Sequence, residues 1–217
     1  MTISYVGGAA GTNSCTLPSF ESGDVAVAFA FRDGSATNPT IASGWTNLTN
    51  TTDGTSCSIS IGWRRLVVGD TTTGTWTNAS RMSVLVYRGC EPFITPCTLK
   101  TAAAGTTHPI NYAAASMTRS DGTSWLCAFV GHRSIDVTCE TAPSGMTNRA
   151  AASGVDATAE ADAHDTNGGV SSWSSTNVTV TGTASGWQTD LVELLALPAQ
   201  LPCDLNMQPA IPAAGPI

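Results

Sequence analysis

The period-two alternation of apolar and small polar residues constrains the fold of this chain more than any other feature. In residues 57–63 (CSISIGW), every odd-numbered residue is apolar and every even-numbered one is small or polar. Because successive side chains of a strand point to opposite faces, this pattern predicts a β-strand with one face in the core. In residues 25–31 (VAVAFAF), both faces are apolar, with large side chains on one and alanines on the other. That pattern predicts a strand covered on both faces.

Further strands are predicted along the chain, and almost no helix. Asp-Gly and Asn-Gly pairs, which are typical of turns, stand between the apolar runs. Charged residues make up only 12% of the chain, and runs of Glu, Lys and Gln that favour helices are missing. The other predicted strands are residues 82–87, 107–112, 125–130, 155–164, 177–181 and 189–197.

Two stretches of the chain resemble each other at an offset near one hundred residues. Residues 22–29 (SGDVAVAF) resemble residues 121–129 (DGTSWLCAF), and residues 41–47 (IASGWTN) resemble residues 142–148 (APSGMTN). Two weaker matches follow in the same order: the strand around Ile59 with that around Ala159, and residues 79–86 with residues 185–192. This order indicates an internal repeat. The alternative is convergence of β-rich sequences drawn from few residue types.

The repeat predicts an all-β fold: a two-sheet antiparallel β-sandwich, jelly-roll-like, made of two related halves. Each half alone would expose an apolar sheet face, so the halves are expected to pack together as a single sandwich over residues 21–197. The halves are residues 21–90 and 121–197, and residues 91–120 form the connector.

Both ends of the chain differ from this body and are predicted to be extended arms. Residues 1–20 combine a short apolar piece, a Gly/Ala-rich turn and Pro18. Residues 198–217 carry five prolines, which exclude a central strand or a helix. We expect this C-terminal arm to dock on a neighbouring subunit through apolar side chains, namely Leu201, Leu205, Met207, Ile211 and Ile217.

The sequence offers little catalytic chemistry, so no enzyme activity and no cofactor are predicted. No nucleophile elbow, phosphate loop, dinucleotide fingerprint or His-Glu-x-x-His pair occurs. The seven cysteines include no CxxC pair, and reduced, buried thiols are favoured over a Cys90–Cys97 disulfide. The three histidines, His108, His132 and His164, show no spacing that favours a Cys–His couple.

One acidic cluster invites a metal interpretation. By strand alternation Asp156, Glu160, Asp162 and His164 share one face, with Asp165 beside them. Hard oxygen ligands of this kind suit Ca²⁺ or a transition metal. Their spacing matches no metal-binding loop, so a solvated sheet face is favoured and no metal is predicted.

Charge and hydropathy limit the partners. The net charge is −7, and the nine basic residues include only one adjacent pair, Arg64 and Arg65, so nucleic acid is not expected. No apolar run approaches the ~18–20 residues of a membrane span, and the first residues lack the features of a secretory signal. A protein that is made and remains in the cytoplasm is expected.

Residues 23–35 (GDVAVAFAFRDGS), 43–46 (SGWT), 62–63 (GW) and 83–89 (SVLVYRG) resemble tailed-bacteriophage virion proteins. These are small Thr/Gly/Ala-rich β-sandwich proteins of tails and fibres, or decorations of heads. The resemblance covers residues 20–90 and, more loosely, 121–196. It implies a non-enzymatic structural component present in many copies, a homo-oligomer whose arms contact other copies and other virion proteins. The expected location is the virion, assembled in the host cytoplasm.

A glycan-binding module for host recognition is the alternative function. It requires two or more exposed tryptophans along one groove, and the chain has six: Trp45, Trp63, Trp76, Trp125, Trp173 and Trp187. Packing in the core or at its rim is the favoured role for these side chains. A hydrolase, the third hypothesis, requires a Cys–His or carboxylate pair in one cleft.

Overall fold

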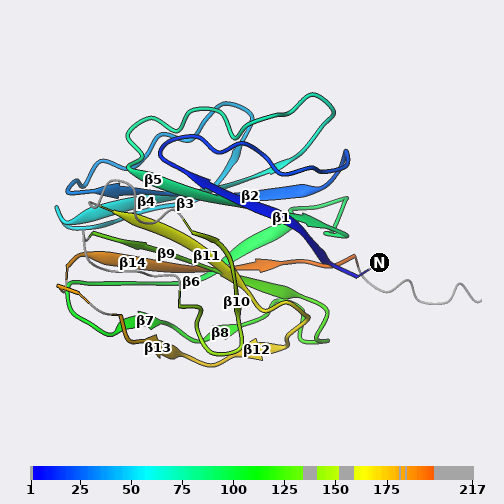
Figure 1. Ribbon diagram of the computed structural model, residues 1–217. Helices are drawn as coiled ribbons and strands as arrows, with labels where there is room; N and C mark the ends of the chain where they lie inside the picture. Colours follow the sequence, from blue (N-terminus) through cyan, green and yellow to red (C-terminus); the bar gives the residue numbers. More distant parts are fainter. Residues whose placement is uncertain (1, 134–140, 152–158, 181, 184, 198–217) are drawn as a thin grey trace, which may run out of the picture.

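The computed structural model describes residues 2–133, 141–151, 159–180, 182–183 and 185–197. Two antiparallel five-stranded sheets face each other, and the described residues contain no helix (Figure 1). The predicted all-β, two-sheet sandwich is therefore confirmed. The predicted C-terminal arm, residues 198–217 with its five apolar contact residues, lies outside the described residues.

The first sheet comes from the first half of the chain and the second sheet from the second half. The first has the order β1-β5-β2-β4-β3 and consists of β1 (Ser4–Gly11), β2 (Val25–Asp33), β3 (Thr46–Asp53), β4 (Cys57–Arg65) and β5 (Arg81–Arg88). The second has the order β10-β11-β9-β14-β6 and consists of β6 (Cys97–Gly105), β9 (Trp125–His132), β10 (Thr147–Ala151), β11 (Glu160–Asp165) and β14 (Trp187–Leu194).

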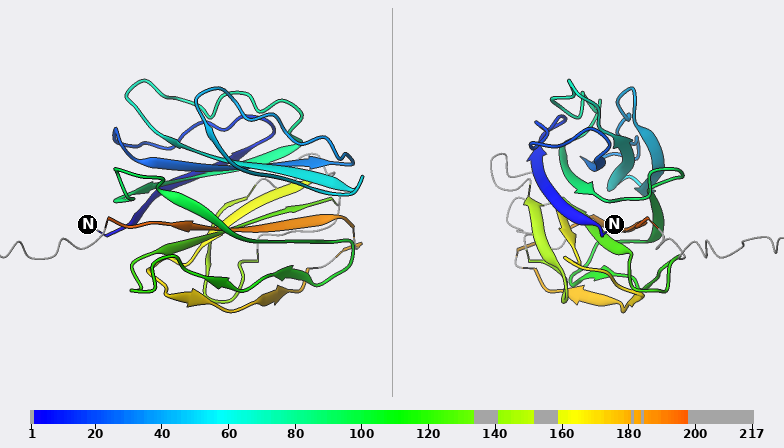
Figure 2. Two further views of the ribbon diagram at one scale, coloured as in Figure 1. Left: turned by 180° about the vertical axis from the view of Figure 1, so that it is seen from behind. Right: turned by 90° about the vertical axis from the view of Figure 1, so that its right-hand side faces the viewer.

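A thinner third layer covers the outer face of the second sheet (Figure 2). It contains two short strand pairs, β8 with β12 and β7 with β13; their bounds are β7 (Ile110–Tyr112), β8 (Ala115–Ser116), β12 (Ser172–Trp173) and β13 (Thr176–Val178). Loops with Trp45 and Trp76 cover the outer face of the first sheet in the same way. Both central strands, β2 and β9, are therefore buried on both faces.

The two sheets share one topology. Counted within its own sheet, each has the order first, fifth, second, fourth, third strand. The third strand of each sheet carries a β-bulge, at Leu48 in β3 and at Arg149 in β10. The turns before these strands contain Gly44 (φ 85°) and Gly145 (φ 83°), positions that the repeat aligns. The two stretches that the predicted repeat aligns therefore lie in different sheets, and the repeat itself stays a prediction.

The jelly-roll detail is not confirmed, because the strands of each main sheet come from one continuous stretch of chain. Instead, the first strand of each sheet lies over the third strand of the other sheet. β1 lies over β10 while β3 lies over β6, and the central strands β2 and β9 face each other. A reciprocal arrangement of this kind is what two copies of one unit adopt in an isologous pair.

The prediction of an N-terminal arm over residues 1–20 is wrong in part. This segment contains β1, an edge strand paired with β5. Its Gly-Gly-Ala-Ala run reads as a turn, but here small residues permit close packing. A Cβ on Gly7 would lie 2.6 Å from the Cβ of Pro18, and a Cβ on Gly8 would lie 3.0 Å from the carbonyl oxygen of Arg149. Glycine within a strand often marks such a close approach.

The predicted connector, residues 91–120, is also wrong in part, because it contains β6, the edge strand paired with β14. Its Thr-Ala-Ala-Ala-Gly run lacks large apolar residues, so alternation does not mark it as a strand. The small residues again have a packing role: a Cβ on Gly105 would lie 2.6 Å from a ring carbon of Trp187. With β1 and β6 included, each main sheet has five strands.

The core between the sheets follows the alternation in β2. Val25, Val27, Phe29 and Phe31 point into the inter-sheet core, whereas the alanines between them face the outer cover, as predicted. At the centre, the rings of Phe29 and Phe129 stack with centroids 5.5 Å apart and planes 12° apart. These two residues occupy equivalent positions in the predicted repeat.

Removing either ring of this stack should destabilise the protein. We expect Phe29→Ala and Phe129→Ala each to lower the free energy of unfolding by about 3–5 kcal/mol, because both side chains are fully buried. The double variant should lose less than the sum, with a coupling energy of about 0.5–1.5 kcal/mol for the stacked pair. Urea unfolding of the four proteins measures this coupling. Strictly additive losses would contradict the central role of the stack.

Candidate functional site

The described cysteines are structural rather than reactive. All five are buried and free: Cys15, Cys57, Cys90, Cys97 and Cys127. Burial raises the pKa of Cys15, Cys57 and Cys90 to about 12 and the pKa of Cys97 and Cys127 well above the ordinary value. Since the thiolate is the nucleophile and metal ligand, these thiols are inert at neutral pH. Cys139 and Cys203 lie outside the described residues.

The histidines contact each other rather than a described cysteine. Nε2 of His108 lies 3.0 Å from Nε2 of His132, so one ring donates a hydrogen bond to the other. His164 lies apart on β11, fully buried, and neither ring nitrogen has a hydrogen-bond partner. Burial lowers the pKa of both His132 and His164 to about 4, so both are neutral at pH 7. This pairing does not match the Cys–His couple that a hydrolase would require.

The described residues of the acidic cluster are buried. The solvated sheet face expected from the sequence is therefore wrong. Glu160, Asp162 and His164 alternate with Ala161 and Ala163, which belong to the inter-sheet core. The three polar side chains therefore face the other way, toward the outer layer, and each is at most 4% exposed. No group of three or more metal-ligating side chains forms among the described residues. Asp156 lies outside them.

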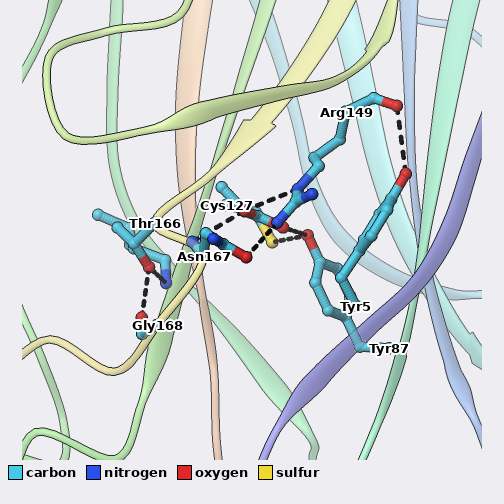
Figure 3. A network of polar contacts seen from close by, with 9 residues as sticks. Tyr5, Tyr87, Cys127, Arg149, Thr166, Asn167 and Gly168 are labelled. Carbon is cyan, nitrogen blue, oxygen red and sulfur yellow. Dashed lines mark hydrogen bonds and ion pairs between the residues drawn. The ribbon is translucent and has the colours of Figure 1, made fainter.

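Asp165 points to the opposite face and joins the two sheets in a buried polar network (Figure 3). Its carboxylate accepts hydrogen bonds from the hydroxyl of Tyr87 at 2.8 Å and from Nε of Arg149 at 3.0 Å. The Arg149 guanidinium lies 4.2 Å from the centre of the Tyr5 ring, and Cys127 Sγ lies 3.3 Å from the Tyr87 hydroxyl. Tyr5 and Tyr87 belong to the first sheet and the others to the second. The network therefore fixes the edge where β1 lies over β10.

Asp190 is a second buried carboxyl group, on the inter-sheet face of β14 opposite Phe129. It is 1% exposed, and neither of its carboxylate oxygens has a hydrogen-bond partner. Burial raises its pKa from 3.8 to about 7. An uncharged carboxyl group enclosed in the sandwich affects stability, and it has no described partner group for acid–base chemistry.

The raised pKa of Asp190 predicts that the stability of the protein falls as the pH rises. Because folding raises its pKa, its contribution to stability is full below about pH 4 and is lost as the pH rises through about 7. At about 1.4 kcal/mol per pKa unit, wild-type protein should lose about 4 kcal/mol relative to Asp190→Asn between pH 4 and pH 8. Urea unfolding of both proteins across this pH range measures the difference between their free energies of unfolding. The contributions of His132 and His164 cancel in this difference, because both proteins contain them. A constant difference would contradict the burial of an unpaired Asp190.

The tryptophans do not form the platform that glycan stacking requires. All six lie in described residues: Trp45, Trp76, Trp125 and Trp187 are buried, and Trp63 and Trp173 are half-buried. The Nε1 groups of Trp45 and Trp187 donate hydrogen bonds to the carbonyl oxygens of Thr73 and Thr107. These indoles pack within the protein, as the sequence analysis favoured.

Exposed apolar side chains gather at one end of the sandwich. Four large hydrophobic residues of the described chain are exposed: Val67, Val68, Phe93 and Ile94, with Val68 at 88% and Phe93 at 85%. Val67 and Val68 follow the end of β4, whereas Phe93 and Ile94 lie between β5 and β6. We call this end, with these four residues and the adjacent pocket, the terminal face. β1 begins at this end, and the described chain also finishes there (Figure 1).

A pocket of about 560 Å³ opens on the terminal face. Its walls are the loop 21–24, Arg65 and Arg88 at the ends of β4 and β5, Gly89 and Cys90, Pro92 and Phe93, and Leu197. Arg88 donates two hydrogen bonds of 2.9 Å to Asp24 and one of 2.8 Å to Glu21. Although burial acts to raise the pKa of Asp24, the bonds from Arg88 and the Glu21 backbone hold it below its usual value. The pocket thus has a neutralised ionic wall and an apolar wall that includes Phe93.

Hydrogen bonds hold the last described residues on this face. The backbone N–H of Glu91 donates to the carbonyl oxygen of Leu195 at 2.7 Å, and the N–H of Leu195 donates to Pro96 at 2.8 Å. The Arg119 guanidinium donates to the carbonyl oxygen of Ala196 and pairs with Glu91 at 3.0 Å. Leu197, the last described residue, lines the same pocket as Phe93.

The sequence analysis did not single out the terminal face. A usable signal was present, since Phe93 and Ile94 stand between Pro92 and Pro96 in a segment without alternation. An apolar pair between two prolines fits poorly in a central strand, so its exposure on a loop could have been expected.

Comparison with protein-family models, with curated proteins and with solved structures gives no match for this chain. Within the described residues, no helix is long and apolar enough to cross a membrane. The geometry of the chain itself is therefore the basis for its proposed function.

Proposed function

We propose that this protein is a non-enzymatic structural component of a bacteriophage virion, either tail-associated or head-decorating. It assembles with other copies of itself and with other virion proteins through the terminal face and the C-terminal arm. The observation that carries the proposal is two exposed apolar loops at one end of the sandwich, Val67 with Val68 on one and Phe93 with Ile94 on the other, beside the pocket that Leu197 lines.

The physical argument is that an exposed apolar patch favours association. Single exposed hydrophobic residues are common on soluble proteins, whereas a group of them marks an interaction site. An aromatic side chain such as Phe93, exposed beside a pocket, is the kind of residue that dominates binding energy when a partner covers it. Many weak contacts of this type add up in a multi-copy assembly.

The rest of the sandwich suits a structural role. Two packed sheets, bridged by the Asp165 network, present one rigid body with its docking groups at one end. The described thiols are held protonated and the described acids of β11 are buried, which disfavours surface catalysis. A net charge of −7 disfavours nucleic acid as a partner. The proposed location is the virion, assembled in the host cytoplasm.

The proposal predicts stable incorporation into phage particles that depends on the terminal face. Particles purified from cells that produce the wild-type protein should contain it in many copies, measured by quantitative mass spectrometry. Phe93→Ser with Ile94→Ser should lower the incorporated amount by at least about tenfold, since an anchor residue contributes 2 kcal/mol or more. Deletion of residues 198–217 should also lower it.

The matched control is Thr55→Ala, an exposed residue in the turn between β3 and β4 at the opposite end. It should incorporate like the wild-type protein. Absence of the wild-type protein from purified particles would overturn the virion assignment. Normal incorporation of both the double variant and the truncated protein would refute docking through this end.

A further inference from the structure

The pocket of the terminal face lies directly beside the point where the described chain ends. Leu197, the last described residue, is part of its wall, and the other apolar wall residues are Cys90, Pro92 and Phe93. Twenty residues follow Leu197 in the sequence. The pocket volume of about 560 Å³ falls within the range of 300–1,000 Å³ typical of ligand sites.

The sequence of these twenty residues is complementary to the pocket. Segment 198–217 has five prolines and several large apolar side chains, and its one charged side chain is Asp204. Proline-rich segments dock in aromatic-lined grooves, because their extended backbone is preformed and loses little entropy on binding. Phe93 offers an exposed aromatic ring, and Arg65 offers a rim cation that contacts only backbone carbonyl oxygens, of Gly23 and Glu91, in its described hydrogen bonds.

The geometry at the exit favours a neighbouring copy over the same chain. Leu197 and Leu201 each precede a proline, and the residue before proline prefers an extended backbone. An extended backbone places the far residues of a segment well away from its first residue, so a pocket on another molecule suits them better than the pocket beside Leu197. At about 3.3 Å per residue, twenty extended residues span up to about 65 Å, which is enough to reach another molecule.

We infer that the terminal-face pocket of one copy binds the Pro-rich segment 198–217 of a neighbouring copy, with Phe93 as the main contact. This inference rests on the proposed function, because it names the acceptor surface for the C-terminal arm. The exchange is directional: each copy donates one segment and accepts another. Reciprocal exchange between two copies closes a two-fold dimer, whereas exchange passed from copy to copy generates a ring or a filament.

Trans-complementation between two full-length variants tests this exchange. The pocket variant, Phe93→Ser, retains the segment, and the segment variant, Leu201→Ser with Leu205→Ser and Met207→Ser, retains the pocket. Sedimentation velocity of the wild-type protein should show concentration-dependent association. Each variant alone should associate at least about 30-fold more weakly, the loss expected for an anchor residue. An equimolar mixture should regain a one-to-one complex, since one intact pocket meets one intact segment.

Val68→Ser is the comparison variant, because Val68 belongs to the terminal face and is as exposed as Phe93 but does not line the pocket. It should weaken association much less than Phe93→Ser does. Thr55→Ala, at the opposite end of the sandwich, should associate like the wild-type protein. Circular dichroism should show an unchanged fold for every variant, since Phe93 and Val68 are exposed and make little contribution to the core.

Three results would overturn the inference: a monomeric wild-type protein at its highest soluble concentration, no complex in the mixture, or equal weakening by Val68→Ser and Phe93→Ser. The last result would indicate general apolar association instead of pocket binding. Particle incorporation is measured separately. The terminal-face variants could still lower incorporation into particles while the mixture of variants forms no complex in solution. That result would refute the segment exchange and would leave the proposed function standing.

Discussion

The stacking of Phe29 on Phe129 is the contact on which the rest of the structure depends. Each ring lies on the central strand of its sheet, and both of these strands, β2 and β9, are buried on both faces. Around this centre the strands face each other reciprocally, with β1 over β10 and β3 over β6. Gly131 is the place where the two units must differ, because a Cβ there would lie 2.1 Å from the Phe31 ring. One unit supplies a large ring, and the other supplies the space for it.

This close packing explains where function can and cannot lie. The thiols, the histidines of β9 and β11, and the carboxyl group of Asp190 are enclosed by the sheets and their covers. Burial lowers the pKa of His132 and His164 and raises the pKa of Asp190, so it favours the uncharged form of each group. Uncharged buried groups suit packing rather than catalysis. The terminal face differs, because its apolar residues are exposed on loops that are held by hydrogen bonds at their bases. Association through this end is therefore the activity that the geometry favours.

Alternation was sufficient to predict the strands with large residues on one face, such as β2 and β4, and to place Glu160, Asp162 and His164 together. It could not show the third layer that buries them, because that layer forms from distant short strands. It also missed β1 and β6, whose glycines and alanines are required by close packing. The repeat was one residue out of register in β14: Val192, rather than Leu191, packs in the inter-sheet core as Leu85 does. A one-residue slip exchanges the two faces of a strand, and only tertiary pairing fixes it.

The central claim is that a rigid sandwich associates through one end. Hydrogen–deuterium exchange of the protein, free and within assembled particles, tests this claim most directly. The account predicts that assembly slows exchange in peptides covering residues 66–70 and 89–96 and leaves β2, β4, β9 and β14 unchanged. Protection confined to the exposed edge strand β3 or to the outer layer of β7 and β13, with no change at the terminal face, would contradict it.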